Sequence, residues 1–249
     1  MQVNGNSNRT DCKACPLQKR ESLRPLDEGQ IEFMNQFKQG EMALDRGAQL
    51  FTQGINSPHL YTLLNGVMMR YRLLEDGRRQ VVNYMFPGDI VGIQGAMNDP
   101  LDHCVEAITS CQLCIFLREN LPALYQQQPQ LGFDITWLAA KEESALEEHL
   151  VTLGQRKAAA RLAYLALFLL DRGEETGMGT RKSIRLSISQ AQIADTLGLS
   201  HVHTNRTIQM LKSKKLLDWS IKGITVVDRD ALEVFAESEG GIRGIRPFV

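Results

Sequence analysis

The sequence lacks the long apolar run of about 18 to 20 residues that a membrane span needs, and its first ten residues are polar, unlike a secretory signal. We therefore expect a cytoplasmic protein without a membrane partner. The chain has only five cysteines, an odd number, and a reducing cytosol disfavours structural disulfides. These thiols are then free, metal-bound or redox-active.

A strong excess of either charge is also missing, since the formal net charge is -1. The charges are nevertheless segregated along the chain. Residues 1–153 carry a net charge of -6, residues 154–227 carry +7, and residues 228–249 carry -2. A basic block of this kind, within a neutral chain, indicates a nucleic-acid partner for that block alone.

Between residues 40 and 117, short β-favouring runs alternate with turn residues, for example at 60–64, 67–74 and 80–86. Glycines punctuate these runs at intervals of 12, 11 and 11 residues, at Gly54, Gly66, Gly77 and Gly88. Strands at this spacing predict an antiparallel sandwich or roll, in which glycine supplies positive-φ turns. A β-rich domain that binds no ligand is the alternative.

From residue 133 to residue 153 the chain has helix-forming residues without glycine or proline after Phe133. Leu146, Leu150 and Leu153 fall on one helical stripe, because they are spaced four and three residues apart. This stripe favours a dimer seam, although a helix packed within its own domain has the same pattern.

Two short helices are predicted in the basic block. Ser189 and Gln192 form a capping box that starts one helix, and Gly198 ends it after about two turns. Ser200 can cap a second helix, which Val202, Ile208 and Leu211 could pin to the first. Two helices joined by a glycine-bearing turn present the second to a DNA major groove. Residues 217–227 follow as strand, turn and strand, which is typical of a wing.

The second helix carries side chains suited to DNA. Arginine can contact guanine O6 and N7, and asparagine or glutamine can contact adenine N6 and N7; lysines suit phosphates. The expected DNA-binding residues are Ser189, Ser200, His201, Val202, His203, Asn205, Arg206, Gln209, Lys212 and Lys214. An ordinary polar helix in an interaction domain would lack the cap, the turn glycine, the basic block and the wing together.

From about Pro25 to Ala236 the sequence resembles the Crp/Fnr family of transcription regulators, through its glycine-punctuated roll, long helix and winged helix-turn-helix. The resemblance implies a homodimer joined along the long helix, a sensor roll, a near-palindromic duplex DNA site and RNA polymerase as a partner. The family's base-reading positions fall at His201, Val202, Asn205 and Arg206. Family members commonly have glutamate where this chain has Val202.

The resemblance also bears on the signal. The cyclic-AMP subfamily binds its ligand through a Gly-Glu pair and an Arg-Ser or Arg-Thr pair; here Ile93 follows Gly92, and Leu101 and Asp102 occupy the phosphate-binding positions. Because Asp102 would repel a phosphate, we do not expect cyclic AMP as the ligand. Another small molecule could still occupy the roll, and a regulator of the same fold that responds to such a molecule is the alternative function.

The oxygen-sensing branch of the family holds a [4Fe-4S] cluster on N-terminal cysteines plus one from the roll. Cys12 and Cys15 supply a pair spaced like metal ligands, and Cys114 aligns with that branch's roll cysteine. The third N-terminal cysteine is absent, so a four-thiolate site would need Cys104 or Cys111. Unligated buried cysteines, a zinc site and a thiol switch are the alternatives.

Two rival classes fit less well. A thiol-redox enzyme places its Cys-x-x-Cys after a strand, whereas this pair lies in a polar arm, so no enzyme is expected. A cyclic-nucleotide-binding module with a non-DNA partner would leave the basic block unexplained. The predicted fold is α+β, with an N-terminal antiparallel β-roll, a long dimerisation helix and a C-terminal winged helix-turn-helix. Its segments are an arm with the cysteine pair (1–27), the sensor roll (28–130), the dimerisation helix (131–153), the DNA-binding domain (154–236) and a flexible tail (237–249).

Overall fold

The computed structural model describes residues 10–95, 100–237 and 245–249. The chain divides into two compact units, each with its own set of contacts. The first comprises Met1–Met68, Met85–Lys141 and Ile245–Val249, and the second comprises Met69–Tyr84 and Glu142–Gly244. No helix in these described stretches is both long and apolar enough to cross a membrane.

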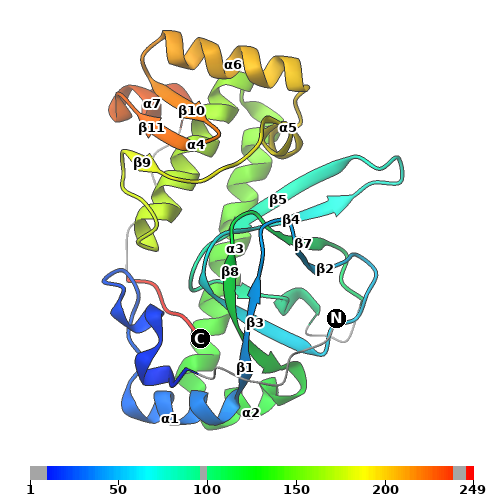
Figure 1. Ribbon diagram of the computed structural model, residues 1–249, viewed down its shortest axis with the longest axis vertical. Helices are drawn as coiled ribbons and strands as arrows, with labels where there is room; N and C mark the ends of the chain where they lie inside the picture. The colour runs from blue at the N-terminus through cyan, green and yellow to red at the C-terminus, as the bar shows by residue number, and fades with distance from the viewer. Residues whose placement is uncertain (1–9, 96–99, 238–244) are drawn as a thin grey trace. The chain divides into compact units, whose positions relative to one another are not determined.

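The first unit is built on a four-stranded antiparallel sheet with the order β1-β8-β3-β6 (Figure 1). Its strands are β1 (Lys38–Leu44), β8 (Cys111–Leu117), β3 (His59–Asn65) and β6 (Ile90–Val91). A separate antiparallel pair joins β2 (Gln49–Phe51) to β7 (Cys104–Ala107). The four turn glycines at 54, 66, 77 and 88 all have φ between 82° and 91°, which confirms their predicted role in the turns.

Alternation along β3 and β8 gives the sheet two apolar faces, because successive side chains point to opposite sides. One face carries Tyr61, Leu63 and Leu113 into the interior of the roll, where Phe51 and Val105 also lie. The other face carries Leu60, Leu64, Cys114 and Phe116 into a second cluster. The roll is therefore covered on its outer face instead of being exposed there.

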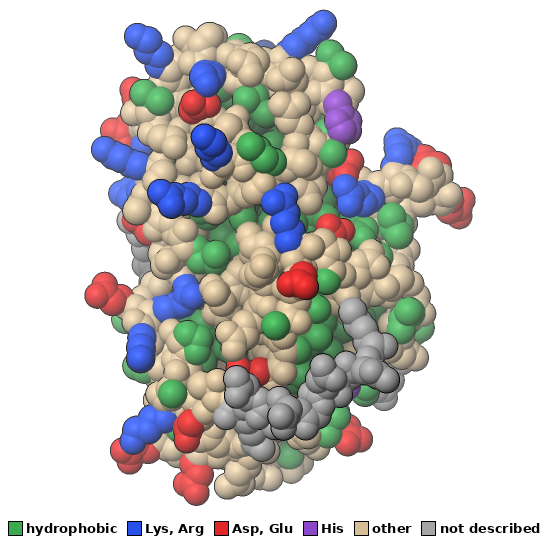
Figure 2. Space-filling model, viewed as in Figure 1, with side chains coloured by type: hydrophobic (Ala, Val, Ile, Leu, Met, Phe, Trp, Pro, Cys, Tyr) green, Lys and Arg blue, Asp and Glu red, His purple; other side chains and the backbone are tan. Residues whose placement is uncertain are grey.

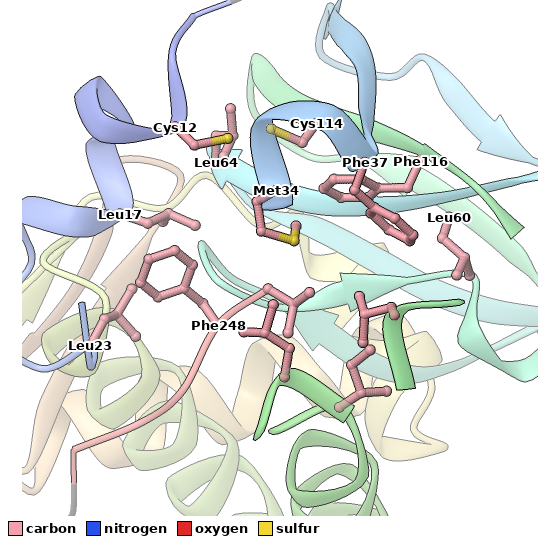
Figure 3. Close-up of a cluster of buried hydrophobic side chains, with 14 residues drawn as sticks. Cys12, Leu17, Leu23, Met34, Phe37, Leu60, Leu64, Cys114, Phe116 and Phe248 are labelled. Carbon is pink, nitrogen blue, oxygen red and sulfur yellow. The ribbon is translucent and has the colours of Figure 1, made fainter. Parts of the chain in front are cut away.

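The second cluster is completed by segments from both ends of the chain (Figure 3). The arm contributes Leu17 and Leu23 from around two short 3₁₀ helices, Cys12–Ala14 and Pro16–Lys19. The helices α1 (Glu28–Phe37), α2 (Leu121–Gln127) and the first part of α3 (Pro129–Gln155) add further apolar side chains. Phe248 and Val249 are buried in the same cluster.

The flexible tail predicted for residues 237–249 is thus wrong for Ile245–Val249, which belong to the first unit. The Arg246 backbone bonds to Ser22 and Arg24 at 2.9 and 2.8 Å, and its side chain pairs with Asp89. Apolar burial together with these polar contacts outweighs the chain entropy that the preceding glycines imply. Most of residues 238–249, including those glycines up to Gly244, lie outside the described residues.

The second unit holds the winged helix-turn-helix and the β4–β5 hairpin (Figure 1). The hairpin consists of β4 (Met68–Leu73) and β5 (Arg79–Met85), and Gly77, one of the predicted turn glycines, lies in its turn with φ 82°. The long helix predicted over residues 131–153 is confirmed as α3, Pro129–Gln155, whose second half lies in this unit. The apolar helix α4 (Ala158–Glu175) follows, and its Leu165, Leu169 and Leu170 are fully buried.

After α4 come β9 (Ser183–Ile184), α5 (Gln190–Leu197), α6 (His201–Ser213), β10 (Leu217–Ser220), β11 (Gly223–Val226) and α7 (Arg229–Ala236). The predicted wing is confirmed as the antiparallel pair β10 and β11. β9 adds a third strand to β11, which the sequence analysis missed because the strand has only two residues. The observed elements agree with the predicted α+β class and the predicted order of roll, long helix and winged helix-turn-helix.

Candidate DNA-binding site and cysteine site

The turn between α5 and α6 is built by local capping. The Ser189 side chain accepts a hydrogen bond from Gln192 N at 3.2 Å, and the Gln192 side chain accepts one from Ser189 N at 2.9 Å. Gly198 ends α5 with φ 63°, a left-handed conformation that glycine adopts without a steric penalty. Ser200 then caps α6 by accepting from His203 N at 3.2 Å. The two serines therefore shape the helices.

The helix α6 has one buried and one exposed face. Thr204, Thr207, Ile208 and Leu211 are buried against the rest of the second unit. The exposed positions are those predicted to read DNA, namely His201, Val202, His203, Asn205, Arg206, Gln209 and Lys212. The expectation that Val202 pins α6 to α5 is wrong, since its side chain is 61% exposed; buried threonines occupy the packing positions instead.

The exposed face offers donors and acceptors of the kind that base edges recognise. Asn205 is additionally contacted by Gln190 Nε2 at 3.4 Å, from the first turn of α5. Arginine and lysine side chains are spread over the surface of the winged helix-turn-helix, as expected of a surface that meets phosphates (Figure 2). The arrangement of helix, wing and basic surface suits the binding of duplex DNA.

Two of the predicted phosphate-binding lysines already have partners in the protein. Lys212 Nζ pairs with both carboxylate oxygens of Asp218 on β10, at 3.1 and 3.0 Å. Lys214 Nζ lies over the Phe235 ring, 5.5 Å from its centroid. Both lysines are exposed, so a phosphate could compete for them; Lys222, in the exposed turn of the wing, is a further candidate.

Large apolar side chains are exposed at three positions of the long helix α3. Leu150 is 72% exposed, Val151 is 48% exposed, and Phe133 is 63% exposed. Of the other two leucines in the predicted seam, Leu146 and Leu153 are half-buried. Apolar side chains of this size are unusual on the surface of a monomer when they lie close together.

Three of the five cysteines gather at the outer apolar cluster of the first unit. Cys12 and Cys114 are members of this cluster, and Cys15 packs against it. Figure 3 shows the Cys12 and Cys114 sulfur atoms turned toward each other. The arm is held there by the hydrogen bond from Cys12 N to Asn35 Oδ1 at 2.8 Å. The structure thus brings together the three cysteines singled out in the sequence.

A buried ion pair beside these thiols was not predicted. Lys38 Nζ lies 2.5 Å from Glu41 Oε1, and the two side chains are only 2% and 7% exposed. Burial alone would lower the pKa of Lys38, but the Glu41 partner outweighs it and the pKa is raised. The i,i+3 charge spacing was readable from the sequence, but its burial was not, because it depends on the arm folding over β1.

Burial favours the protonated form of two of these thiols, Cys114 and Cys15. Burial raises the pKa of Cys114 to about 12, and the neighbouring Cys15, Glu41 and Cys12 raise it further, whereas Lys38 acts in the opposite direction. Burial likewise raises the pKa of Cys15. Protonated, buried thiols react slowly with oxidants, while a bound metal would displace their protons.

The structure does not bring Cys104 or Cys111 to the other three. Cys111 lies on the opposite face of β8 from Cys114, and its Sγ donates to Thr109 O at 3.3 Å. Cys104 lies on β7 and accepts from Gln53 N at 3.3 Å. Among residues 10–95, 100–237 and 245–249, no group of three or more His, Cys, Asp or Glu side chains is arranged to hold a metal ion. Four cysteines for a [4Fe-4S] cluster are therefore not assembled within those residues.

The roll interior has an uncommon cation near the positions discussed for cyclic AMP. Arg118 is 8% exposed, and it donates to the carbonyls of Ser57 and His59 at 3.0 and 3.1 Å. Its Nη1 atom has no hydrogen-bond partner within the described part of the chain. Asp102, by contrast, is exposed and pairs with His103 at 3.1 Å. The sequence analysis compared only the positions from Gly92 to Asp102 with the cyclic-AMP subfamily. It did not point to Arg118, because Arg118 lies well beyond them in the sequence.

Comparison with known proteins supports this arrangement. A family described as cyclic nucleotide-binding domain matches residues 41–128, and one described as Crp-like helix-turn-helix domain matches residues 160–235. The nitrogen fixation regulation protein FixK of Bradyrhizobium diazoefficiens is 30% identical over 229 residues, covering 90% of this chain and 93% of its own. The fumarate and nitrate reduction regulatory protein of Vibrio cholerae is 24% identical, covering 89% and 88%.

Among solved structures, FixK2 from Bradyrhizobium japonicum is similar with a TM-score of 0.69 and 23% identity, covering 81% of this chain and 98% of that one. At this identity the likeness is one of fold. Because both domain families match in the observed order and a relative of almost equal extent reaches 30% identity, the chain belongs to the Crp/Fnr family of transcription regulators, on its Fnr-like branch, and is not an enzyme.

Proposed function

We propose that this regulator works as a homodimer that reads a near-palindromic duplex DNA site with α6 and takes a redox signal through Cys12, Cys15 and Cys114. The exposed polar face of α6, capped by Ser200 and followed by a wing, is the observation that carries the DNA-reading role. The proposed partners are duplex DNA, a second copy of the chain, and RNA polymerase at the bound site.

Base reading is assigned chiefly to Arg206, which is exposed on α6 and can contact guanine bidentately. Arg206→Ala should weaken binding to the specific site by about 1 to 3 kcal/mol and relax the preference at one base per half-site. Lys222→Ala, in the wing turn, is the matched control and should weaken specific and random DNA alike. Binding measurements on both DNAs test this; equal losses for Arg206→Ala would contradict the assignment.

Dimerisation is assigned to the exposed apolar side of α3 around Leu150 and Val151. Leu150→Asp would place a charge in that contact, at a cost of several kcal/mol, and should yield monomers that bind DNA weakly. Val234→Asp is a suitable control, because Val234 is 81% exposed and lies on α7. The mass in solution of the wild-type chain and of both variants is the test. If Leu150→Asp remains a dimer, the proposed dimer contact along α3 is refuted.

The redox role is supported by three thiols from two distant segments meeting beside the buried Lys38–Glu41 pair. A [4Fe-4S] cluster would take thiolates from these three cysteines, which are not arranged as a metal-binding group among the described residues, and it would need a fourth ligand other than Cys104 and Cys111. Since Cys12 and Cys114 are buried and burial raises the pKa of Cys15 and Cys114, we favour a metal or cluster over direct thiol oxidation. When bound, such a group would be the part of the site that reacts with oxygen, and it would tie the arm to the roll.

The test is chemical analysis of the chain purified without oxygen, for iron, sulfide and zinc, together with DNA affinity before and after exposure to air. Each of the substitutions Cys12→Ser, Cys15→Ser and Cys114→Ser should abolish metal binding and the response to oxygen. The substitutions Cys104→Ser and Cys111→Ser should leave metal binding and the oxygen response intact, and these two variants are the controls. If the wild-type chain carries no metal and its DNA affinity ignores both oxygen and thiol oxidants, the redox role is refuted.

A regulator of the same fold that responds to a small molecule is the second candidate function. The buried Arg118, whose Nη1 atom lacks a partner among the described residues, favours an anionic ligand in the roll. Calorimetric titration with cyclic di-GMP tests this, and cyclic AMP is the control compound that should not bind. Binding of cyclic di-GMP to the metal-free chain, with a change in DNA affinity, would favour this candidate over the redox role.

A further inference from the structure

Within the second unit, the β4–β5 hairpin contacts two helices at once, and these contacts are polar and directional. One helix is α5, the first helix of the helix-turn-helix. The other is the second half of α3, where dimerisation is proposed. Neither set of contacts is used in the DNA-binding function described so far.

On the α5 side, Arg79 donates from Nε and Nη2 to Asp195 Oδ2 at 3.1 and 2.9 Å. The Tyr84 hydroxyl lies 2.8 Å from Thr196 Oγ1, and both residues are fully buried. Gln80 Nε2 adds a bond to Thr196 O at 3.0 Å. Burial raises the pKa of Tyr84, so its hydroxyl keeps its proton at neutral pH.

On the α3 side, a single carboxylate is bound by both strands of the hairpin. Arg70 Nη2 of β4 donates to Glu142 Oε1, and Asn83 Nδ2 of β5 donates to Glu142 Oε2, each at 2.7 Å. Arg70 and Asn83 are 4% and 5% exposed. Shielded hydrogen bonds that involve a charged group are stronger than neutral, exposed ones, and they fix orientation as well as distance.

The position of α5 determines that of α6. The two helices are separated by three residues, Gly198 to Ser200, and the capping at both ends of this turn fixes its geometry. The apolar side chains of Leu197, Ile208 and Leu211 are buried around the joint. Whatever holds α5 against the hairpin therefore also holds the exposed reading face of α6.

We propose that the β4–β5 hairpin is a strut that sets the orientation of α6 relative to α3, with Arg79, Tyr84 and Glu142 as positioning residues for DNA reading. The inference rests on the proposed function, because it assumes that α3 pairs with its copy. A dimer reads two half-sites together only if both reading helices are held at a fixed angle to the shared seam.

This role predicts a specific loss. Without the strut, each α6 can still contact one half-site, but a dimer must order two loose domains to contact both. The affinity for a palindromic site should fall, whereas the affinity for a half-site should stay the same. A loss of about tenfold in the ratio of these affinities is expected, which corresponds to about 1.4 kcal/mol.

The experiment compares Arg79→Met and Tyr84→Phe with Arg78→Met in the full-length chain. Arg78 lies at the hairpin tip and pairs with Asp76 instead of α5, so its variant is the matched control. The double variant Arg79→Asp with Asp195→Arg reverses the ion pair and should restore the ratio. Tyr84→Phe removes one oxygen atom and preserves the packing, so it remains informative if the charge variants fold poorly.

The inference is overturned if Arg79→Met and Tyr84→Phe keep the wild-type ratio, or if Arg78→Met lowers it equally. It is also overturned if the half-site affinity falls as much as the palindrome affinity, since that would indicate general damage to α6. A wild-type chain that binds half-site and palindrome equally would instead refute the proposed dimeric reading of DNA, and the strut with it.

Discussion

Replacing Glu41 by glutamine tests whether the buried pair beside the thiols holds the arm to the roll. Its carboxylate accepts hydrogen bonds from Lys38 Nζ at 2.5 Å, from Thr10 N at 3.1 Å, and from Gln112 Nε2 at 2.7 Å. It therefore ties the arm to β1 and β8. Lys38 Nζ has one further acceptor, Thr10 O at 2.8 Å.

The expected cost is large because the substitution leaves a buried ammonium group without its counter-charge. Removing one partner of a buried ion pair typically costs about 3 to 5 kcal/mol, whereas an exposed pair is worth about 0 to 1 kcal/mol. Glutamine can still accept from Thr10 N, so we expect the lower end, about 3 kcal/mol. Adding Lys38→Met should recover most of this loss, since both charges are then absent.

Urea unfolding of the wild-type chain, Glu41→Gln, and the double variant Glu41→Gln with Lys38→Met measures these free energies. The slope of free energy against urea should be similar in all three. Glu119→Gln, at an exposed position in the same unit, should change stability by less than about 0.5 kcal/mol. The reasoning is refuted if Glu41→Gln costs under about 1 kcal/mol, or if the double variant is less stable than the single one.

Two further predictions concern buried groups in each unit. Burial lowers the pKa of His149 from 6.5 to about 4, so the unfolded chain takes up a proton first and about 3 kcal/mol of stability should be lost as the pH falls from about 6.5 to about 4. Glu148 opposes this shift, and the Tyr164 ring packs against the imidazole. His149→Phe should flatten that part of the pH profile of unfolding, whereas a change at the exposed His203 should not. Phe248→Ala should cost about 3 to 5 kcal/mol in urea unfolding, and a change below about 1 kcal/mol would contradict the burial of the tail.

The helix-turn-helix could be predicted from sequence because its signals are local. A capping serine, a turn glycine and a second capping serine each act within about four residues, and each has the predicted geometry at Ser189, Gly198 and Ser200. The roll was predicted for the same reason, through glycines that need positive φ. Side-chain packing was harder to predict. Val202 was expected to pack between the two helices because it is apolar, but its side chain faces solvent.

The cysteine site was predictable in part. Nothing local joins Cys12 and Cys15 to Cys114, and only the family resemblance suggested that they meet. The mismatch of Cys111 could have been seen in the sequence, because residues three apart on a strand point to opposite faces. Cys111 and Cys114 on β8 obey this rule, so one strand could not supply both thiols to one centre.

Residues Ile245–Val249 at the end of the chain show why packing between distant segments cannot be predicted from local sequence patterns. The preceding glycines favour disorder, yet Arg246 bonds to the backbone of Ser22 and Arg24, and Phe248 enters the cluster that contains Cys12 and Cys114. The two ends of the chain therefore close the same core beside the thiols. Because packed cores respond to the loss of any one side, a reaction that released the arm would also expose the surface on which the tail rests.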